Sequence, residues 1–427
     1  MQESYRREPA ASTHECSRPR SSCPGAVAKA AVGLTACAFI TARPSIRFHR
    51  RLPHAALTLL LLTLIACRQD LSPTADGKVH FGVSAPLTGD NAQYARLWRQ
   101  GFALALDDIN NQGGVRGRKV VLDWEDSESY PKQAVNIAQR FVDDPRILAE
   151  MGDFSSPCSM AASPVYQRGG LVQFGFTNSH PDFTKSGDYM FSTSASQEVS
   201  ARLLLDLAEH YGRRTAVLYV NNDWGKSSVD IYVAQAAKHG VEVPVVEGFA
   251  DSTTDFRPLL LKVRDAAVDV LVIQSYYRSA ALIVRQTHQV GLEHTKVVWG
   301  NYSQEFINLA GEAAEGTSAM QNFYAQDGGP QAQDFVRRFR ARYKTEPDYF
   351  NVGAYDALMQ LAWAAGQTAQ PTRKGIRETL ATARSIPSVI YGPFAFGPDR
   401  RMSHQTFKEL IVHNGAYVPA GTLSLTN

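Results

Sequence analysis

The feature that most constrains this chain is an alternation of strand-like and helical segments that runs twice. In the first run, apolar strand-like segments at 79–84, 120–124, 147–151 and 171–174 alternate with helical patterns at 96–111 and 132–142. The alternation restarts after Ser196, with strand-like segments at 215–220, 241–246, 270–274 and 296–299 between helical segments. Such an order implies right-handed crossovers and a parallel sheet with helices on both faces. The sequence therefore predicts an α/β protein with two doubly wound lobes.

The last hundred residues have too few strands for a third domain. Three helical segments are predicted at 331–343, 352–366 and 372–381, followed by strands around 390–396 and 407–412. We expect this tail to complete the first lobe and then to cross back. The predicted boundaries are lobe 1 at 78–197, lobe 2 at 198–322, a return to lobe 1 at 323–388, and a crossing back toward lobe 2 with a C-terminal tail at 389–427.

Composition and charge exclude some classes of partner. The 427 residues are 44% hydrophobic and 20% charged, which is typical of globular domains. The formal charge of +3 comes from residues 1–66, which hold nine of the 44 Lys and Arg residues and three of the 41 Asp and Glu residues, leaving 35 basic against 38 acidic residues. No basic patch stands out in that remainder, so we expect no nucleic-acid partner.

The N-terminal segment has the pattern of a targeting sequence. Arg47, Arg50 and Arg51 precede an apolar run at 55–65 that is too short to span a bilayer permanently. The following Leu64-Ile65-Ala66-Cys67 resembles a bacterial lipobox, which implies cleavage before Cys67 and lipid attachment to its sulfur. We therefore expect an extension and signal peptide at 1–66, a tether at 67–77, and an extracytoplasmic, membrane-anchored protein. A competing site at Cys37 follows a weaker run that Lys29 interrupts.

Small hydroxyl residues follow two neighbouring predicted strands. Ser155 and Ser156 come after the strand that ends near Gly152, where a helix is predicted to open at Pro157, and Thr177, Asn178 and Ser179 come after 171–174. The carboxyl ends of parallel strands meet at one edge of a sheet, where backbone N–H groups and hydroxyls suit a bound anion. The alternative is that Ser155, Ser156 and Ser159 only cap the helix and that 177–179 is an ordinary loop.

The first lobe also carries residues of a known family. Val79-His-Phe-Gly-Val-Ser-Ala-Pro-Leu-Thr-Gly-Asp-Asn-Ala-Gln-Tyr94, Asp108-Ile-Asn-Asn-Gln-Gly-Gly-Val-Arg-Gly117 and Pro131-Lys-Gln-Ala-Val135 resemble the type I periplasmic binding proteins. Within them, the chain is most similar to the substrate-binding subunits of branched-chain amino-acid ABC transporters, over nearly all of 78–418. The resemblance implies two lobes that are joined by crossing strands and close around a small molecule, the Venus-flytrap architecture.

The same resemblance implies which residues bind the ligand. Ser156 is similar to the serine that holds the ligand carboxylate, and Thr177 and Ser179 correspond to the segment that holds carboxylate and ammonium. Tyr94, Trp224 and Tyr276 fall where the family places aromatic walls of the cleft. Where amino-acid binders carry an acidic residue after the strand at 296–299, this chain has Gly300-Asn-Tyr-Ser303, and we expect Tyr302 to line the cleft. Without that ion pair, a carboxylate without an amine, an amide or an aromatic acid stays open beside an amino acid.

These features favour a lipid-anchored solute-binding protein that delivers a small polar ligand to a membrane permease. A ligand-sensing module of the same fold that reports to a signalling partner is the alternative. The sequence has no Gly-x-Ser-x-Gly, no Gly-x-x-x-x-Gly-Lys-Ser/Thr and no His-Glu-x-x-His, and its eleven histidines do not cluster with metal spacing. We therefore expect no catalytic residues, no metal and no cofactor. Cys158, at the predicted helix start, is expected to be a packed residue.

Overall fold

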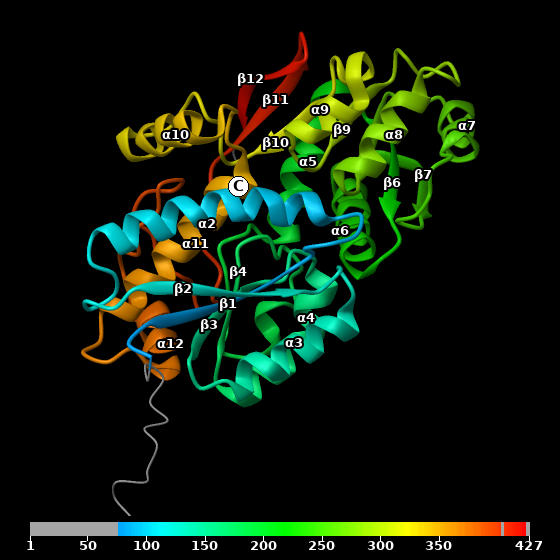
Figure 1. Cartoon of the computed structure of the whole chain (residues 1–427). Coiled ribbons are helices and arrows are strands. Elements are labelled where there is room, and N and C mark those ends of the chain that lie inside the picture. The colour runs from blue at the N-terminus through cyan, green and yellow to red at the C-terminus, as the bar shows by residue number, and fades with distance from the viewer. Residues whose placement is uncertain (1–75, 403–404, 424–427) are drawn as a thin grey trace, which may run out of the picture. The chain divides into compact units, whose positions relative to one another are not determined.

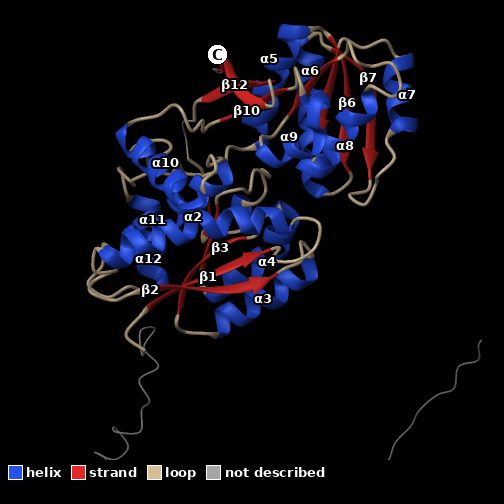
Figure 2. Cartoon of the chain, turned by 45° about the horizontal axis from the view of Figure 1, so that its top comes forward, coloured by secondary structure: helices blue, strands red, loops and turns tan. Residues whose placement is uncertain are grey.

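The structure is a computed structural model that describes residues 76–402 and 405–423. The described residues form one compact unit. The predicted lipidation site Cys67, the competing Cys37 and most of the predicted tether lie outside the described residues. Figures 1 and 2 show two sheets within the described unit, each covered by helices on both faces. The predicted α/β architecture with two doubly wound lobes is thus confirmed.

The sheet of the first lobe has five parallel strands in the order β2-β1-β3-β4-β5. The strands are β1 (Val79–Ala85), β2 (Val120–Asp126), β3 (Ile147–Gly152), β4 (Val172–Gly175) and β5 (Met190–Ser192). Every residue of β1, β3 and β4 is buried, as expected for central strands with helices on both faces. The short strand β5 was not expected from the sequence.

Two pairs of helices cover this sheet on opposite faces (Figures 1 and 2). One pair is α3 (Pro131–Asp143) with α4 (Ser156–Gly169), and the other is α2 (Ala92–Asn111) with α11 (Tyr349–Gly366). Gly101 lets α2 approach α11 closely, because a Cβ at this position would lie 1.9 Å from the backbone oxygen of Asn351. The Asn351 side chain fixes the same contact by donating from Nδ2 to Leu97 O at 2.9 Å. The first lobe therefore depends on a helix that lies about 250 residues further along the chain.

The sheet of the second lobe has seven strands in the order β12-β11-β10-β9-β8-β6-β7. Its first five strands along the chain pair in parallel, whereas β11 runs antiparallel to both β10 and β12. The strands are β6 (Arg214–Val220), β7 (Glu242–Phe249), β8 (Val270–Gln274), β9 (Lys296–Trp299), β10 (Ser318–Gln321), β11 (Phe407–His413) and β12 (Ala416–Leu423).

Alternating apolar residues of these strands face two helical layers. Val270 and Val272 of β8 pack in one cluster with α5 (Gln197–Tyr211) and α6 (Asp223–His239). Leu271 and Ile273 face the other layer, which consists of α7 (Arg257–Asp265), α8 (Tyr277–Thr287) and α9 (Gln304–Ala310). Among the described helices, none is long and apolar enough to cross a membrane.

The tail departs in part from the expectation. The helices α10 (Pro330–Tyr343), α11 and α12 (Arg373–Thr382) follow β10, and α11 and α12 contact elements of the first lobe. The prediction of a strand at 390–396 is wrong, because this segment forms only isolated bridges, at Ile386–Phe394 and Phe396–Met402. Gly392 and Pro393 interrupt the segment, and proline cannot donate to a ladder. The chain then returns to the second sheet as β11 and β12.

Arg401 holds one of the segments where the chain crosses between the lobes. Its buried guanidinium donates to Asn178 O at 3.1 Å, to Ser194 O at 3.3 Å and also to His180 O. Burial lowers the pKa of Arg401 to about 10, so the side chain stays charged at neutral pH. The last crossing segment is therefore tied to the loop after β4 and to the first crossing after β5.

Candidate ligand-binding site

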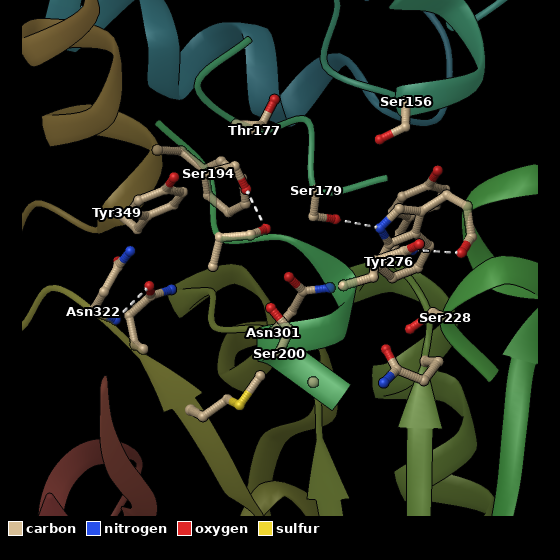
Figure 3. A pocket seen from close by; sticks show the side chains of 18 of the residues that line it. Ser156, Thr177, Ser179, Ser194, Ser200, Ser228, Tyr276, Asn301, Asn322 and Tyr349 are labelled. Atoms are coloured by element: carbon tan, nitrogen blue, oxygen red, sulfur yellow. Dashed lines mark hydrogen bonds between the residues drawn. The ribbon is translucent and has the colours of Figure 1, made fainter. Parts of the chain in front are cut away.

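A cavity lies where the carboxyl ends of the first-lobe strands face the second lobe. Its empty volume is about 930 Å³, including space open to solvent. Figure 3 shows that serine, asparagine and tyrosine side chains from both lobes surround it. The lining residues are Tyr94, Phe154, Ser155, Ser156, Thr177, Ser179, Ser194, Ala195, Gln197, Ser200, Trp224, Ser228, Gln274, Tyr276, Gly300, Asn301, Met320, Gln321, Asn322, Tyr349, Phe350 and Phe407.

The first wall is the start of α4. Ser155 precedes the helix in an extended conformation, and Pro157 in the first turn has no N–H to leave unpaired. Ser156 is the first residue of α4 and is buried, yet within the described part of the chain its Oγ has no hydrogen-bond partner. A buried hydroxyl without a partner at a helix N-terminus is a group that a ligand can satisfy.

Two buried carboxyl groups lie directly behind this wall. Asp153 accepts hydrogen bonds from Ser155 N at 3.2 Å and from Ser84 Oγ at 3.0 Å. Burial raises the pKa of Asp153 to about 6, although these hydrogen bonds oppose the shift. Burial also raises the pKa of Glu150 in β3 well above its ordinary value, and neither of its carboxyl oxygens has a partner among the described residues. The protein thus places its own acids beneath the helix start.

Thr177 and Ser179 line the cavity, but their side chains already have protein partners. Thr177 Oγ1 donates to Phe154 O at 3.1 Å, which fixes the loop before α4. Ser179 Oγ accepts from Trp224 Nε1 of α6 at 2.9 Å, so this hydrogen bond joins the two lobes (Figure 3). The Trp224 carbonyl in turn accepts from Gln197 Nε2 at 2.7 Å. Within the described residues the Ser179 hydroxyl only accepts, so its hydrogen is available to a ligand.

Tyr94, Trp224 and Tyr276, the three expected aromatic residues, lie near one another and line the cavity. Trp224 stacks on Tyr276 with ring centroids 5.6 Å apart, and Tyr94 stacks on Phe154 at 3.8 Å. Tyr276 OH accepts from Asn222 Nδ2 at 3.1 Å, and Tyr94 OH accepts from the backbone N–H of Tyr277 at 3.3 Å. These rings form one wall and connect α2 of the first lobe to β8 and α8 of the second.

Tyr302 does not fulfil its expected role, because it is not among the residues that line this cavity. It is buried against Tyr417 of β12, with ring centroids 4.3 Å apart, and Gly300 and Asn301 line the cavity in its place. This partner could not be inferred from the sequence, because β12 was not expected.

Five amide side chains that line the cavity were not predicted from the sequence. Asn301 and Asn322 are labelled in Figure 3, and the full group is Gln197, Gln274, Asn301, Gln321 and Asn322. Gln274 is the last residue of β8 and Asn322 directly follows β10. For Gln274, a polar residue at the carboxyl end of a predicted apolar strand was the available signal, whereas no strand was predicted before Asn322.

The described residues hold no group of three or more His, Cys, Asp or Glu side chains that could bind a metal ion. Cys158 is a free, buried thiol, and burial raises its pKa, so its position in the first turn of α4 does not activate it. The arrangement can hold a small molecule by hydrogen bonds and aromatic contacts.

Comparison with known proteins agrees with this geometry. A sequence model of the family described as periplasmic binding protein matches residues 78–407. An "amino acid binding protein" of Pseudomonas aeruginosa is 28% identical over 310 residues, which are 71% of this chain and 83% of that protein. A substrate-binding protein from Desulfitobacterium hafniense, solved with Leu, is 25% identical with a TM-score of 0.69 and covers 80% of this chain and all of its own. A leucine-binding protein of Thermotoga maritima, 23% identical, shares the fold with a TM-score of 0.76 over 81% of this chain and 98% of its own.

Proposed function

The chain belongs to the periplasmic binding protein family and is a solute-binding protein, not an enzyme, and we propose that it captures an amino acid or a related carboxylate or amide outside the cytoplasm. The proposed ligand binds between the lobes and is passed to the permease of an ABC importer. The lipobox-like Leu64–Cys67 supports a membrane tether through Cys67.

The cavity carries this proposal. Its walls come from both lobes, and the hydrogen bond from Trp224 to Ser179 crosses between them at the cavity edge. A ligand in this position contacts both lobes only when they are closed, so binding shifts the population toward the closed form. A permease that binds the closed form preferentially would therefore recognise the protein when solute is bound.

A thermal-shift screen of the protein against amino acids, amides, carboxylates and a concentrated metabolite extract tests the proposal. A solute at 100 times its Kd should stabilise the protein by about 2.7 kcal/mol. The shift should shrink in Trp224→Leu, which removes a wall of the cavity, and persist in Tyr130→Leu, which alters a side chain that is 61% exposed. If neither the pure solutes nor the extract stabilises the protein, the proposal fails.

Deletion of the gene separates transport from sensing. A transport component is required for uptake of the solute found in the screen, so uptake should fall in the deleted strain. Normal uptake together with a lost transcriptional or behavioural response to the same solute would instead assign the protein to signalling.

A further inference from the structure

The cavity wall carries no formal charge. None of its lining residues, all of them within the described ranges, is Asp, Glu, Lys, Arg or His. A ligand with a full charge would leave water without an opposite charge to compensate it, and an uncompensated buried charge is strongly unfavourable. No lining side chain of opposite charge therefore faces either end of a zwitterion.

The helix start that would hold a ligand carboxylate is already next to an acid of the protein. Asp153 is only 1% exposed and accepts from Ser155 N, so it uses part of the positive end of α4. A carboxylate bound at Ser155 and Ser156 would add a second negative charge close to Asp153. A carbonyl oxygen can accept from the same N–H and hydroxyl groups without adding a charge.

Two amide side chains that line the cavity, Gln197 and Asn322, present hydrogen-bond acceptors. Gln197 Nε2 donates to the backbone oxygen of Trp224, and a backbone oxygen can only accept, so the orientation of this amide is fixed. Its Oε1 is buried and, across the described residues, has no partner. Gln197 therefore needs a donor that the described protein does not supply.

The orientation of the Asn322 amide is set by that of its neighbour Gln405. Gln405 Nε2 donates to Thr193 O at 2.9 Å, so Gln405 Oε1 must be the acceptor that faces Asn322 Nδ2 at 3.1 Å. Asn322 Oδ1 is then the free end of its amide, and no described residue donates to it. Figure 3 shows Asn322 and Ser156 on opposite sides of the cavity.

We propose that the ligand is a small uncharged molecule of the carboxamide class, with a carbonyl at Ser155 and Ser156 and separate N–H donors at Gln197 and Asn322. This inference rests on the proposed solute-binding function of the cavity and specifies its ligand. It places α-amino acids and free carboxylates among the poorly bound solutes.

Calorimetry with a matched series of probes tests the ligand class. The probes are the diamides malonamide, succinamide, glutaramide and adipamide, the dicarboxylate of each length, and L-leucine. We expect at least one diamide to bind about tenfold or more tightly than its dicarboxylate and than L-leucine. Tighter binding of L-leucine or of a dicarboxylate, or no binding of any diamide, overturns the inference. Binding of L-leucine alone would leave the proposed function intact, whereas failure of every solute and of the metabolite extract would remove both.

The variant Asn322→Leu tests the acceptor directly. It should reduce the advantage of the best diamide over the monoamide of equal length by about tenfold, because the monoamide has no far donor to lose. A general disturbance of the fold would weaken both probes equally and leave their ratio unchanged. Asn136→Leu, on the exposed side of α3, is the control and should keep the ratio. An unchanged ratio in Asn322→Leu overturns the placement of the donor end.

Discussion

Ser156 is buried in the first turn of α4, and no described residue is a hydrogen-bond partner of its hydroxyl oxygen. Replacing it by alanine should therefore cost little stability, since no internal hydrogen bond is lost. We expect Ser156→Ala to weaken binding of the cognate solute by about tenfold, the value of one buried hydrogen bond, with an unchanged free energy of unfolding. Calorimetry and urea denaturation measure the two quantities.

Ser163 is the matched control for this prediction. It lies on the same helix, and its Oγ is 2.8 Å from Ser159 O and 2.7 Å from Gln173 Oε1, so its single hydrogen has two possible acceptors. Ser163→Ala should lower the free energy of unfolding by about 1 kcal/mol and leave the affinity alone. Equal affinities of Ser156→Ala and the unaltered protein would mean that Ser156 does not touch the ligand.

Asp153 makes the stability of the protein depend on pH. Its pKa is about 6 in the folded protein against a value of 3.8 for a free side chain. The folded state therefore binds more protons between these values, so stability falls as the pH rises from about 4 to about 6 and is then constant. The shift corresponds to about 3 kcal/mol.

Asp153→Asn should remove this contribution. We expect its free energy of unfolding, measured in urea at several pH values from 4 to 7, to fall less steeply with rising pH than that of the unaltered protein. Asp348 and Asp356 have raised pKa values of about 7 and about 6, so part of the slope should remain. Parallel curves for the two proteins would contradict the assignment to Asp153.

At the scale of elements, the packing of α2 on α11 is the contact most sensitive to a small change. A methyl group on Gly101 would collide with the backbone of Asn351, which cannot move without shifting α11. We expect Gly101→Ala to destabilise the protein by about 3 kcal/mol. Gly366→Ala, at the end of α11 with no atom within 4 Å of the new Cβ, should be neutral or slightly stabilising. Thermal denaturation compares the two variants, and equal melting temperatures would contradict the prediction.

Strands with a run of apolar residues could be predicted from the sequence, including the four-residue β4 and β9, and strands without such a run could not. All of β1 and β8 is buried, and every residue except His80 and Gln274 is apolar or small, so a run of such residues identifies these strands. β5 has three residues, β10 has the polar residues Ser318 and Gln321 at its ends, and β12 contains Pro419 at the edge of the sheet, so none of them has a clear strand pattern. Missing β10 and β12 explains why Asn322 was overlooked and why Tyr302 was placed in the cavity.

At the scale of the whole molecule, the two-lobe plan could be predicted because the alternation repeats, and the family motifs placed Tyr94, Trp224 and Tyr276 near one another. The hydrogen bonds between the lobes could not be predicted. The hydrogen bond from Trp224 to Ser179 depends on how the two lobes pack against each other, and no local sequence pattern encodes that geometry.

The proposed membrane tether is a property of the whole molecule as well. Because a lipid can be attached only to the cysteine thiol, Cys67→Ser should move the protein from the membrane fraction to the soluble extracytoplasmic fraction. Cys158→Ser and Cys37→Ser should stay with the membrane, and immunoblots of the separated fractions distinguish them. Release of the protein by Cys37→Ser, with Cys67→Ser retained, would assign the lipid to the competing site.

The discontinuous lobes also determine when folding can finish. The helix α2 near the start of the described chain needs α11, and the sheet of the second lobe needs β11 and β12 near its end. Neither lobe can complete its core until most of the polypeptide has left the ribosome. A chain that remains unfinished for so long is suited to export through a narrow channel in an unfolded state, with folding completed on the far side.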